Sequence, residues 1–344
     1  MKVGIDARGA VWYRGTGIGT YTYQLLHHLK QRPEKDSYRL FWPGEEYVSL
    51  DISSRKDFSE VEGEEHYWEQ TYLPKAIAKE KLDLYHVPQN GIGLPQVKKC
   101  KQVVTIHDLI PYVYPETTGK KYLQTFLNDM PHIVESCDRI ITVSQCSKKD
   151  ITNIFGYPAD KIDVIPEAPE PFYRLMSKEV ARKKLAEKYG IAGNFVLYVG
   201  GFGPRKNVRG LLVAFSLAQK ELPAQFKLVL PGRLQKEADP TEGLVNALKL
   251  EDRVVFPGFI PPEDLPCFYR ACSLFVYPSF YEGFGLPPLE AMACGAPVLC
   301  ANTSSLPEVV GDGAEMINPF DTIAMAKKIY HLLLSREEAA QLSE

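Results

Sequence analysis

The chain has 344 residues, which is long for a single hydrophobic core and favours two domains. Hydrophobic residues make up 45% of it, and 40 basic residues nearly balance 43 acidic ones. This balance argues against a nucleic-acid-binding protein, for which a basic patch or arm is expected.

Targeting signals are missing from the sequence. Residues 1–20 have neither an apolar central region nor a small-residue cleavage site, and no run of about 18 apolar residues occurs, so we expect no signal peptide and no transmembrane helix. The seven cysteines form no C-x-x-C pair, which favours free thiols in a reducing compartment. We therefore expect a cytoplasmic protein. Lys98, Lys99 and Lys101 leave open a weak peripheral contact with the inner face of the membrane, although such clusters are more often simply solvated.

Short β-rich segments alternate with helical patterns along most of the chain. This alternation predicts an α/β protein with parallel sheets of the doubly wound type. In the first half, strands are expected at residues 2–6, 38–42, 84–87, 102–107, 139–143 and 162–166. In the second half, they are expected at 194–200, 226–232, 253–258, 274–279 and 296–300. The clearest helical patterns are at 19–31, 207–221 and 288–294.

A proline-rich segment, "VIPEAPEPFYRL" at residues 164–175, separates the two series of strands. Prolines at this density interrupt both helix and sheet, and a fresh strand–helix alternation begins at Phe195. We therefore predict two Rossmann-like domains, residues 1–168 and 169–344, that face one another across a cleft.

Three glycines, Gly15, Gly17 and Gly19, follow the first strand and open a helix. Bare amides at a helix N-terminus suit phosphate, and ligands of parallel sheets gather beyond the carboxyl ends of strands. The spacing is G-x-G-x-G rather than the dinucleotide fingerprint G-x-G-x-x-G, which argues against a dehydrogenase. A merely flexible turn explains these glycines equally well.

His107 and Asp108 follow the strand expected at 102–107. At the carboxyl end of a parallel strand, this histidine would project toward a ligand. The alternative is a histidine satisfied by the local backbone, and the two interpretations are evenly balanced.

The turn "GGFGPRKN" follows the first strand of the second half. Its glycines, with Arg205 and Lys206 just before a helix, are typical of a phosphate cradle that has two cations. The alternative is a solvated basic turn.

The segment "SFYEGFGLPPLEAMACGAPVL" at residues 279–299 carries two carboxylates eight positions apart, Glu282 and Glu290. Its Pro-Pro pair suits the first turn of a helix and leaves the amides of Phe284, Gly285 and Leu286 available to ligand oxygens. Glu290, one turn inside the helix, could accept two hydrogen bonds from a vicinal diol. Glu282 would then be free to meet another part of the same ligand. The alternative for Glu290 is an exposed helical glutamate.

This segment resembles the E-x7-E signature of retaining GT-B glycosyltransferases of the family-4 type, several of which are mannosyltransferases or glucosyltransferases. The resemblance extends along nearly the whole chain, through "GTGIGTYTYQLL", "VTIHDLIP", "VSQCSKKDI" and "YVGGFGPRKNVRGLLVAF". Two departures stand out. Gly200-Gly201 occupies the place where many members have Gly-Arg, and "IPEAPE" replaces "IPNGVD".

The resemblance implies that the C-terminal domain binds a nucleotide-sugar donor and the N-terminal domain binds the acceptor. It places Glu290 on the ribose diol, Glu282 and His107 beside the transferred sugar, and Arg205 and Lys206 on the diphosphate. It also implies substrate contacts from loop residues of both domains: Gly17, Gly19, Asp108, Gly201, Phe284, Gly285 and Leu286.

The chemistry expected from this resemblance is retaining hexosyl transfer without a metal or other cofactor. No D-x-D motif occurs in the sequence, so Arg205 and Lys206 would balance the leaving diphosphate. GDP-mannose is the first donor expected, followed by UDP-glucose and UDP-N-acetylglucosamine, with a saccharide or lipid-linked saccharide of a cell-surface glycan as acceptor. Two alternatives remain open, a GT-B-fold sugar-nucleotide epimerase and a catalytically inactive sugar-nucleotide-binding protein.

Overall fold

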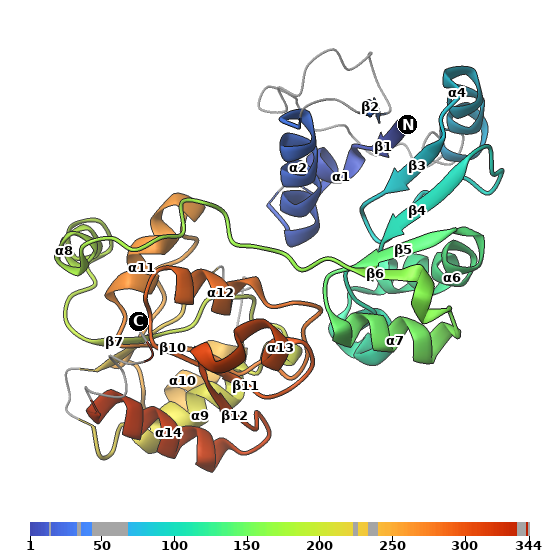
Figure 1. Ribbon diagram of the computed structural model, residues 1–344. Helices are drawn as coiled ribbons and strands as arrows, with labels where there is room; N and C mark the ends of the chain where they lie inside the picture. Colours follow the sequence, from blue (N-terminus) through green and yellow to red (C-terminus); the bar gives the residue numbers. More distant parts are fainter. Residues whose placement is uncertain are drawn as a thin grey trace. The chain divides into compact units, whose positions relative to one another are not determined.

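The computed structural model describes residues 1–13, 15–32, 36–42, 68–222, 226–232, 240–335 and 342. The chain divides into two compact units, Met1–Pro166 and Glu167–Glu344 (Figure 1). The division falls inside the proline-rich segment, two residues before the boundary expected from the sequence.

Unit 1 is built on a parallel sheet with the strand order β2-β1-β3-β4-β5-β6. Its strands are β1 (Lys2–Asp6), β2 (Ser37–Phe41), β3 (Leu84–Val87), β4 (Lys101–Thr105), β5 (Arg139–Thr142) and β6 (Ile162–Val164). The chain runs outward from β1 to β2 and then crosses to β3 on the other side of β1. This reversal makes the gap between the carboxyl ends of β1 and β3 a topological switch point, where open α/β sheets bind ligands.

The helices of unit 1 follow the amphipathic segments of the sequence. They are α1 (Arg8–Trp12), α2 (Gly17–Lys30), the π-helical turn η2 (Trp68–Tyr72), α4 (Leu73–Glu80), α5 (Ile110–Val113), α6 (Lys120–Ser136) and α7 (Gln145–Phe155), with the 3₁₀ turns η3 (Pro115–Thr117) and η4 (Ala159–Lys161). The strands bury Val87, Val104 and Ile140 against Phe126 of α6 and Ile151 of α7. This apolar layer holds the strand ends in fixed positions.

Unit 2 has a second parallel sheet with the strand order β12-β11-β10-β7-β8-β9. Its strands are β7 (Phe195–Leu197), β8 (Lys227–Val229), β9 (Val254–Val255), β10 (Leu274–Tyr277), β11 (Val298–Ala301) and β12 (Glu315–Ile317). The chain moves from β7 through β8 to β9 and returns to β10 on the other side of β7. The switch point of this unit therefore lies between β7 and β10.

Seven helices accompany this sheet in the described part of unit 2. They are α8 (Lys178–Tyr189), α9 (Val208–Ala218), α10 (Pro240–Ala247), α11 (Leu265–Ala271), α12 (Leu286–Ala293), α13 (Leu306–Val310) and α14 (Thr322–Leu334), with the 3₁₀ turns η5 (Pro204–Lys206), η6 (Pro262–Asp264) and η7 (Gly311–Gly313). α9 packs against α14, and α8 against α11. Leu211 and Phe215 of α9 and Ile329 of α14 are fully buried in the core of this unit.

The predicted parallel α/β fold class is confirmed, and a strand occurs within or overlapping every predicted strand segment. The sequence interpretation missed β12, a three-residue edge strand that is too short and too exposed to show a clear pattern. Among the described residues, no helix is long and apolar enough to cross a membrane. All seven cysteines are free.

The basic cluster considered for membrane contact is partly neutralised. Lys98 and Lys101 lie 2.6 Å and 2.9 Å from the carboxylate of Asp138. Burial would raise the pKa of Asp138, but these two lysines and the amide of Gln102 lower it to about 2. Asp138 therefore stays ionised at neutral pH and reduces the positive charge that this surface presents.

Candidate active site

Two candidate ligand-binding segments, the turn after β7 and the loop after β10, flank the switch point of unit 2. The turn after β7 carries Arg205 and Lys206 in η5, and the loop after β10 carries Glu282. Because β7 and β10 are hydrogen-bonded neighbours in the sheet, their carboxyl ends bring these segments together.

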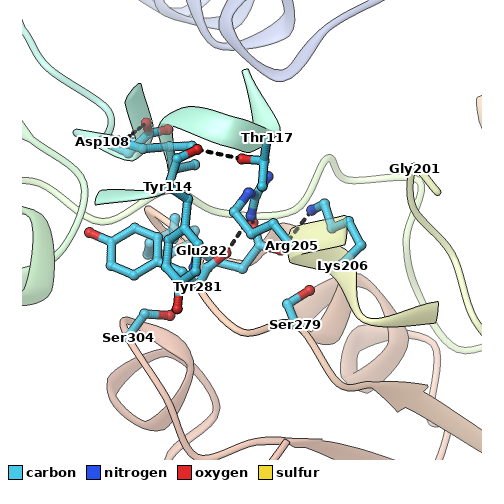
Figure 2. A network of polar contacts seen from close by, with 12 residues as sticks. Asp108, Tyr114, Thr117, Gly201, Arg205, Lys206, Ser279, Tyr281, Glu282 and Ser304 are labelled. Atoms are coloured by element: carbon cyan, nitrogen blue, oxygen red, sulfur yellow. Dashed lines mark hydrogen bonds and ion pairs between the residues drawn. The ribbon is translucent and has the colours of Figure 1, made fainter. Parts of the chain in front are cut away.

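Glu282 forms ion pairs with both cations (Figure 2). Its Oε2 lies 2.8 Å from Nη1 of Arg205, and its Oε1 lies 2.6 Å from Nζ of Lys206. Lys206 also donates to the hydroxyl of Tyr277, which in turn donates to Oε1 of Glu282. Arg205 makes a further hydrogen bond to the carbonyl of Tyr281. Glu282 is therefore paired with both cations in this structure, and its contact with another part of the ligand stays a prediction.

The electrostatics of Glu282 follow from these contacts. The residue is 7% exposed, and burial would raise the pKa of its carboxyl group. Lys206 and Arg205 outweigh that effect and lower the pKa of Glu282 to about 2. Glu282 is thus a carboxylate at neutral pH and cannot act as a general acid.

Two serines at the start of α13 hold the loop that carries Glu282. The amide of Glu282 donates to Oγ of Ser304 at 2.8 Å, and the hydroxyl of Ser305 donates to the carbonyls of Glu282 and Phe284. Gly285 has φ of +120°, and a Cβ atom there would lie 2.6 Å from Cδ2 of Leu306. Only glycine fits this close approach without strain.

The N-terminus of α12 keeps backbone donors available. Among the described residues, none is recorded as accepting a hydrogen bond from the amides of Phe284, Gly285 and Leu286, and Pro287 and Pro288 have no N–H group. These amides follow Glu282, the partner of Arg205 and Lys206, by two to four positions, and they suit oxygens of an anionic or hydroxylated ligand.

Glu290 lies one turn inside α12, as predicted, but in surroundings unlike those of Glu282. The hydroxyl of Tyr269 donates to its Oε2 at 2.8 Å, and Tyr173 also interacts with its carboxyl group. Burial raises the pKa of Glu290 to about 7, against the opposing effect of these two phenols, and Glu170 raises it further. The residue is partly buried rather than exposed on the helix surface.

The turn after β7 is tied to the rest of the site by Asn207. Its side chain caps α9 by accepting from the amide of Gly210, and its Nδ2 donates to the carbonyls of Pro278 and Pro319. Gly201 is exposed, its carbonyl accepts from the hydroxyl of Tyr198, and a Cβ atom at this position would meet nothing within 4 Å. The position could therefore hold the larger residue common in the resembled family.

His107 belongs to unit 1, where it follows β4 and is buried. Its Nε2 lies 3.0 Å from the carbonyl of Pro88, so this nitrogen carries the proton, and the ring of Tyr21 packs edge-on at 4.6 Å. Its amide donates to Asn90, and its carbonyl accepts from the hydroxyl of Ser147. One ring nitrogen of His107 is therefore hydrogen-bonded to the backbone, as the alternative interpretation expected. The same contacts also fix the orientation of the imidazole.

The remaining candidates of unit 1 have local structural contacts. Gly17 begins α2 and is exposed, whereas the amide of Gly19 donates to Oγ1 of the N-cap residue Thr16. The expected bare amide at Gly19 is therefore already occupied. Asp108 accepts from the amide of Ile110 and so stabilises the start of α5. Tyr21 links α2 to His107, which places the first turns of α2 beside this histidine.

The structure brings the unit 2 candidates together and groups the unit 1 candidates separately. Sequence reasoning missed several supporting residues: Asn207, Tyr269, Tyr277, Ser304 and Ser305. Asn207 had a detectable signal, because Asn directly before a helical pattern is a typical N-cap. The others reach the site through tertiary packing. In the described part of the chain, no cluster of three or more His, Cys, Asp or Glu side chains could hold a metal ion.

Comparison with solved structures identifies the fold. Sucrose-phosphate synthase from Thermosynechococcus elongatus matches with a TM-score of 0.75 at 22% identity, over 100% of this chain and 92% of that one. Anabaena HepE in complex with UDP and glucose matches with a TM-score of 0.73 at 20% identity, over 100% and 92%. These likenesses show the GT-B glycosyltransferase fold.

Sequence relatives place the chain more narrowly. The family model "Glycosyltransferase Family 4" matches residues 15–168, and "Glycosyl transferases group 1" matches residues 181–344. O-antigen chain mannosyltransferase B of Escherichia coli is 33% identical over 97% of this chain and 91% of the relative. The serotype-specific mannosyltransferase WbdA of Escherichia coli is 34% identical over 64% of this chain, which corresponds to 28% of that relative. The chain belongs to the family 4 glycosyltransferases and is a glycosyltransferase.

Proposed function

We propose that this glycosyltransferase transfers mannose from GDP-mannose to a saccharide or lipid-linked saccharide acceptor in cell-surface polysaccharide synthesis, with retention of anomeric configuration and without a metal ion. The choice of sugar and pathway is supported by a relative that is named an O-antigen chain mannosyltransferase and aligns over 97% of this chain. In this proposal unit 2 binds the donor, and unit 1 binds the acceptor.

The observation that carries the proposal is the charge arrangement at the switch point of unit 2. Arg205 and Lys206 both pair with Glu282, which lies only two to four positions before the available amides at the start of α12, so two cations and a helix N-terminus belong to one site. A diphosphate is the ligand that such a set of donors favours. Glu290, further along α12, would accept hydrogen bonds from the ribose diol.

The same groups can stabilise the reaction. As the bond between the anomeric carbon and the diphosphate oxygen breaks, negative charge grows on the leaving group, and Arg205 and Lys206 oppose it. The acceptor hydroxyl then bonds to the anomeric carbon from the same face, and its proton passes to the departing phosphate oxygen. Because Glu282 is ionised and paired with both cations, we assign it to orientation and charge balance rather than to proton donation.

The carboxylate of Glu282 occupies the cations that a diphosphate would need. A bound diphosphate and the carboxylate of Glu282 would compete for the same two cations. We propose that donor binding shifts Arg205 and Lys206 toward the diphosphate and lets Glu282 interact with the transferred sugar. This exchange couples recognition of the phosphates to recognition of the sugar.

A panel of nucleotide sugars tests the donor assignment. The melting temperature should rise most with GDP-mannose and less with UDP-glucose and UDP-N-acetylglucosamine, because a ligand that binds the folded state stabilises it. A larger shift with either UDP-sugar would replace GDP-mannose as the donor.

The mechanism is tested on the product. Transfer should survive excess EDTA, and the NMR coupling constant of the new glycosidic carbon should show the donor's configuration. Loss of transfer in EDTA that Mg²⁺ or Mn²⁺ restores would reject metal independence, and an inverted product would reject same-face attack.

A further inference from the structure

Glu290 is held by two tyrosines that approach from outside its own helix. Tyr269 lies on α11, and its hydroxyl donates to Oε2 of Glu290 at 2.8 Å. Tyr173 comes from the segment before α8, its ring packs against that of Tyr269, and it lowers the pKa of the same carboxyl group. Both tyrosines are buried, Tyr269 completely.

Packing fixes these phenols in place. The ring of Tyr269 contacts Phe275 of β10 edge-on, with centroids 5.3 Å apart, and the rings of Tyr173 and Tyr269 contact each other at 6.0 Å. The amide of Tyr173 donates to the carbonyl of Glu170. A side chain with this packing has little freedom to rotate, so its hydroxyl is aimed before any ligand arrives.

The hydrogen bond from Tyr269 leaves Oε1 and the remaining lone pairs of Glu290 for a ligand. A carboxylate has about four acceptor positions, so two phenols and two hydroxyls of a diol can be accommodated together. A protonated carboxyl group offers fewer acceptor positions and lacks the charge that strengthens such bonds.

The charged and titratable surroundings of Glu290 work against its ionisation. Glu170 contributes an unfavourable interaction with the carboxylate, and burial is the largest cause that raises its pKa to about 7. Arg270 of α11 is directed elsewhere, because its Nε donates to the carbonyl of Met176 and its Nη1 to that of Gly295. The two phenols oppose the rise in the pKa of Glu290.

We propose that Tyr269 and Tyr173 are positioning residues that orient the carboxyl group of Glu290 for binding the ribose diol of the donor. This inference rests on the proposed function, in which Glu290 contacts the ribose. It predicts that donor affinity depends on pH and that the tyrosines set where this dependence falls.

The direction in which donor affinity changes with pH follows from the pKa of Glu290. In the wild type, donor affinity should rise with pH as Glu290 loses its proton around pH 7. Removing a phenol that lowers this pKa should move the midpoint to higher pH. Tyr269→Phe should therefore weaken binding about 2- to 10-fold at pH 7, the size expected from one hydrogen bond, and the loss should shrink near pH 9.

The experiment is isothermal titration of the whole chain with GDP-mannose between pH 6 and 9, without acceptor. GDP-mannose suits this range because its diphosphate diester keeps a constant charge there. The variants are Tyr269→Phe, Tyr173→Phe and Glu290→Gln. Tyr189→Phe is the matched control, because this phenol donates to Asp264 instead and packs against Phe268.

The outcomes distinguish the positioning role of the two tyrosines from the ribose contact of Glu290. A higher midpoint in Tyr269→Phe or Tyr173→Phe, with none in Tyr189→Phe, supports the inference. If Glu290→Gln weakens binding but both tyrosine variants match the wild type, or lose affinity equally at every pH, the positioning role is wrong and the ribose contact survives. If Glu290→Gln binds GDP-mannose as well as the wild type does, the ribose contact of the proposed function is itself wrong.

Discussion

Glu282 and Glu290 belong to one loop-and-helix segment, yet the fold treats them in opposite ways. Glu282 lies between Arg205 and Lys206, and its pKa falls to about 2 in spite of burial. Glu290 lies among phenols, and burial raises its pKa to about 7, only partly opposed by the hydrogen bond from Tyr269 and by Tyr173. Two carboxylates eight positions apart therefore differ in charge behaviour across the range from acidic to neutral pH.

For these two buried carboxylates, the charge of the neighbouring groups determines the pKa more than burial does. Two cations more than offset the cost of removing Glu282 from water, whereas neutral hydroxyls offset only part of that cost for Glu290. A permanently charged Glu282 suits a role in charge balance at the diphosphate and sugar. A carboxyl group that titrates near neutrality suits a contact whose strength varies with pH.

Removing a cation that pairs with Glu282 should have the largest effect on turnover. Lys206→Ala should lower the kcat of transfer by about 100- to 1000-fold, because the leaving diphosphate loses a preorganised positive charge. Steady-state kinetics would measure this loss, with Arg209→Ala, an exposed position on α9, as the control. A Lys206→Ala enzyme with normal turnover would show that this lysine serves only to neutralise Glu282.

The next effect concerns Glu290. Glu290→Ala should weaken binding of the bare nucleoside diphosphate by about 10- to 150-fold, because charge-assisted hydrogen bonds contribute roughly 1.5–3 kcal/mol. The ribose is present whether or not a sugar is attached, so the loss should be similar for the nucleotide sugar. Isothermal titration with both ligands checks this, and a loss confined to the nucleotide sugar would move Glu290 from the ribose to the sugar.

His107 provides a test from the other unit. His107→Ala should reduce kcat by about 10- to 100-fold, the size of one charge-assisted contact in the transition state, while donor affinity stays within about threefold. The reason is that the proposed contacts with the nucleotide part of the donor all lie in unit 2. Kinetics and donor titration on the same variant separate the two quantities. Equal losses of turnover and donor affinity would contradict this division of roles.

The smallest expected change is in the diphosphate affinity of a Glu282 variant. The family resemblance places Glu282 beside the transferred sugar, which predicts an unchanged diphosphate affinity when Glu282 is replaced. Because Glu282 in fact neutralises Arg205 and Lys206, Glu282→Gln should tighten binding of the bare nucleoside diphosphate by about 2- to 10-fold while lowering transfer, since two cations lose a competing anion. Titration at low and high salt would measure the change. Weaker diphosphate binding in this variant would mean that Glu282 organises the cations rather than competing for them.

Much of the fold could be predicted because its signals are local. Apolar segments of four to seven residues alternating with amphipathic helices indicate parallel sheets, and prolines at 166, 169 and 171 mark the segment in which the units divide. The start of α12 near its Pro-Pro pair and the position of Glu290 one turn inside the helix followed from the same kind of local rule.

The state of the site depended on contacts between residues far apart in the chain. The strand order places β7 beside β10, and only that adjacency brings Lys206 within 2.6 Å of Glu282, 76 positions later. The phenol of Tyr269 reaches Glu290 through the packing of α11 against α12. Residue types and spacing indicate which groups can ionise, but the charge that a buried group carries depends on its solvation and neighbours, and those exist only once the chain has folded.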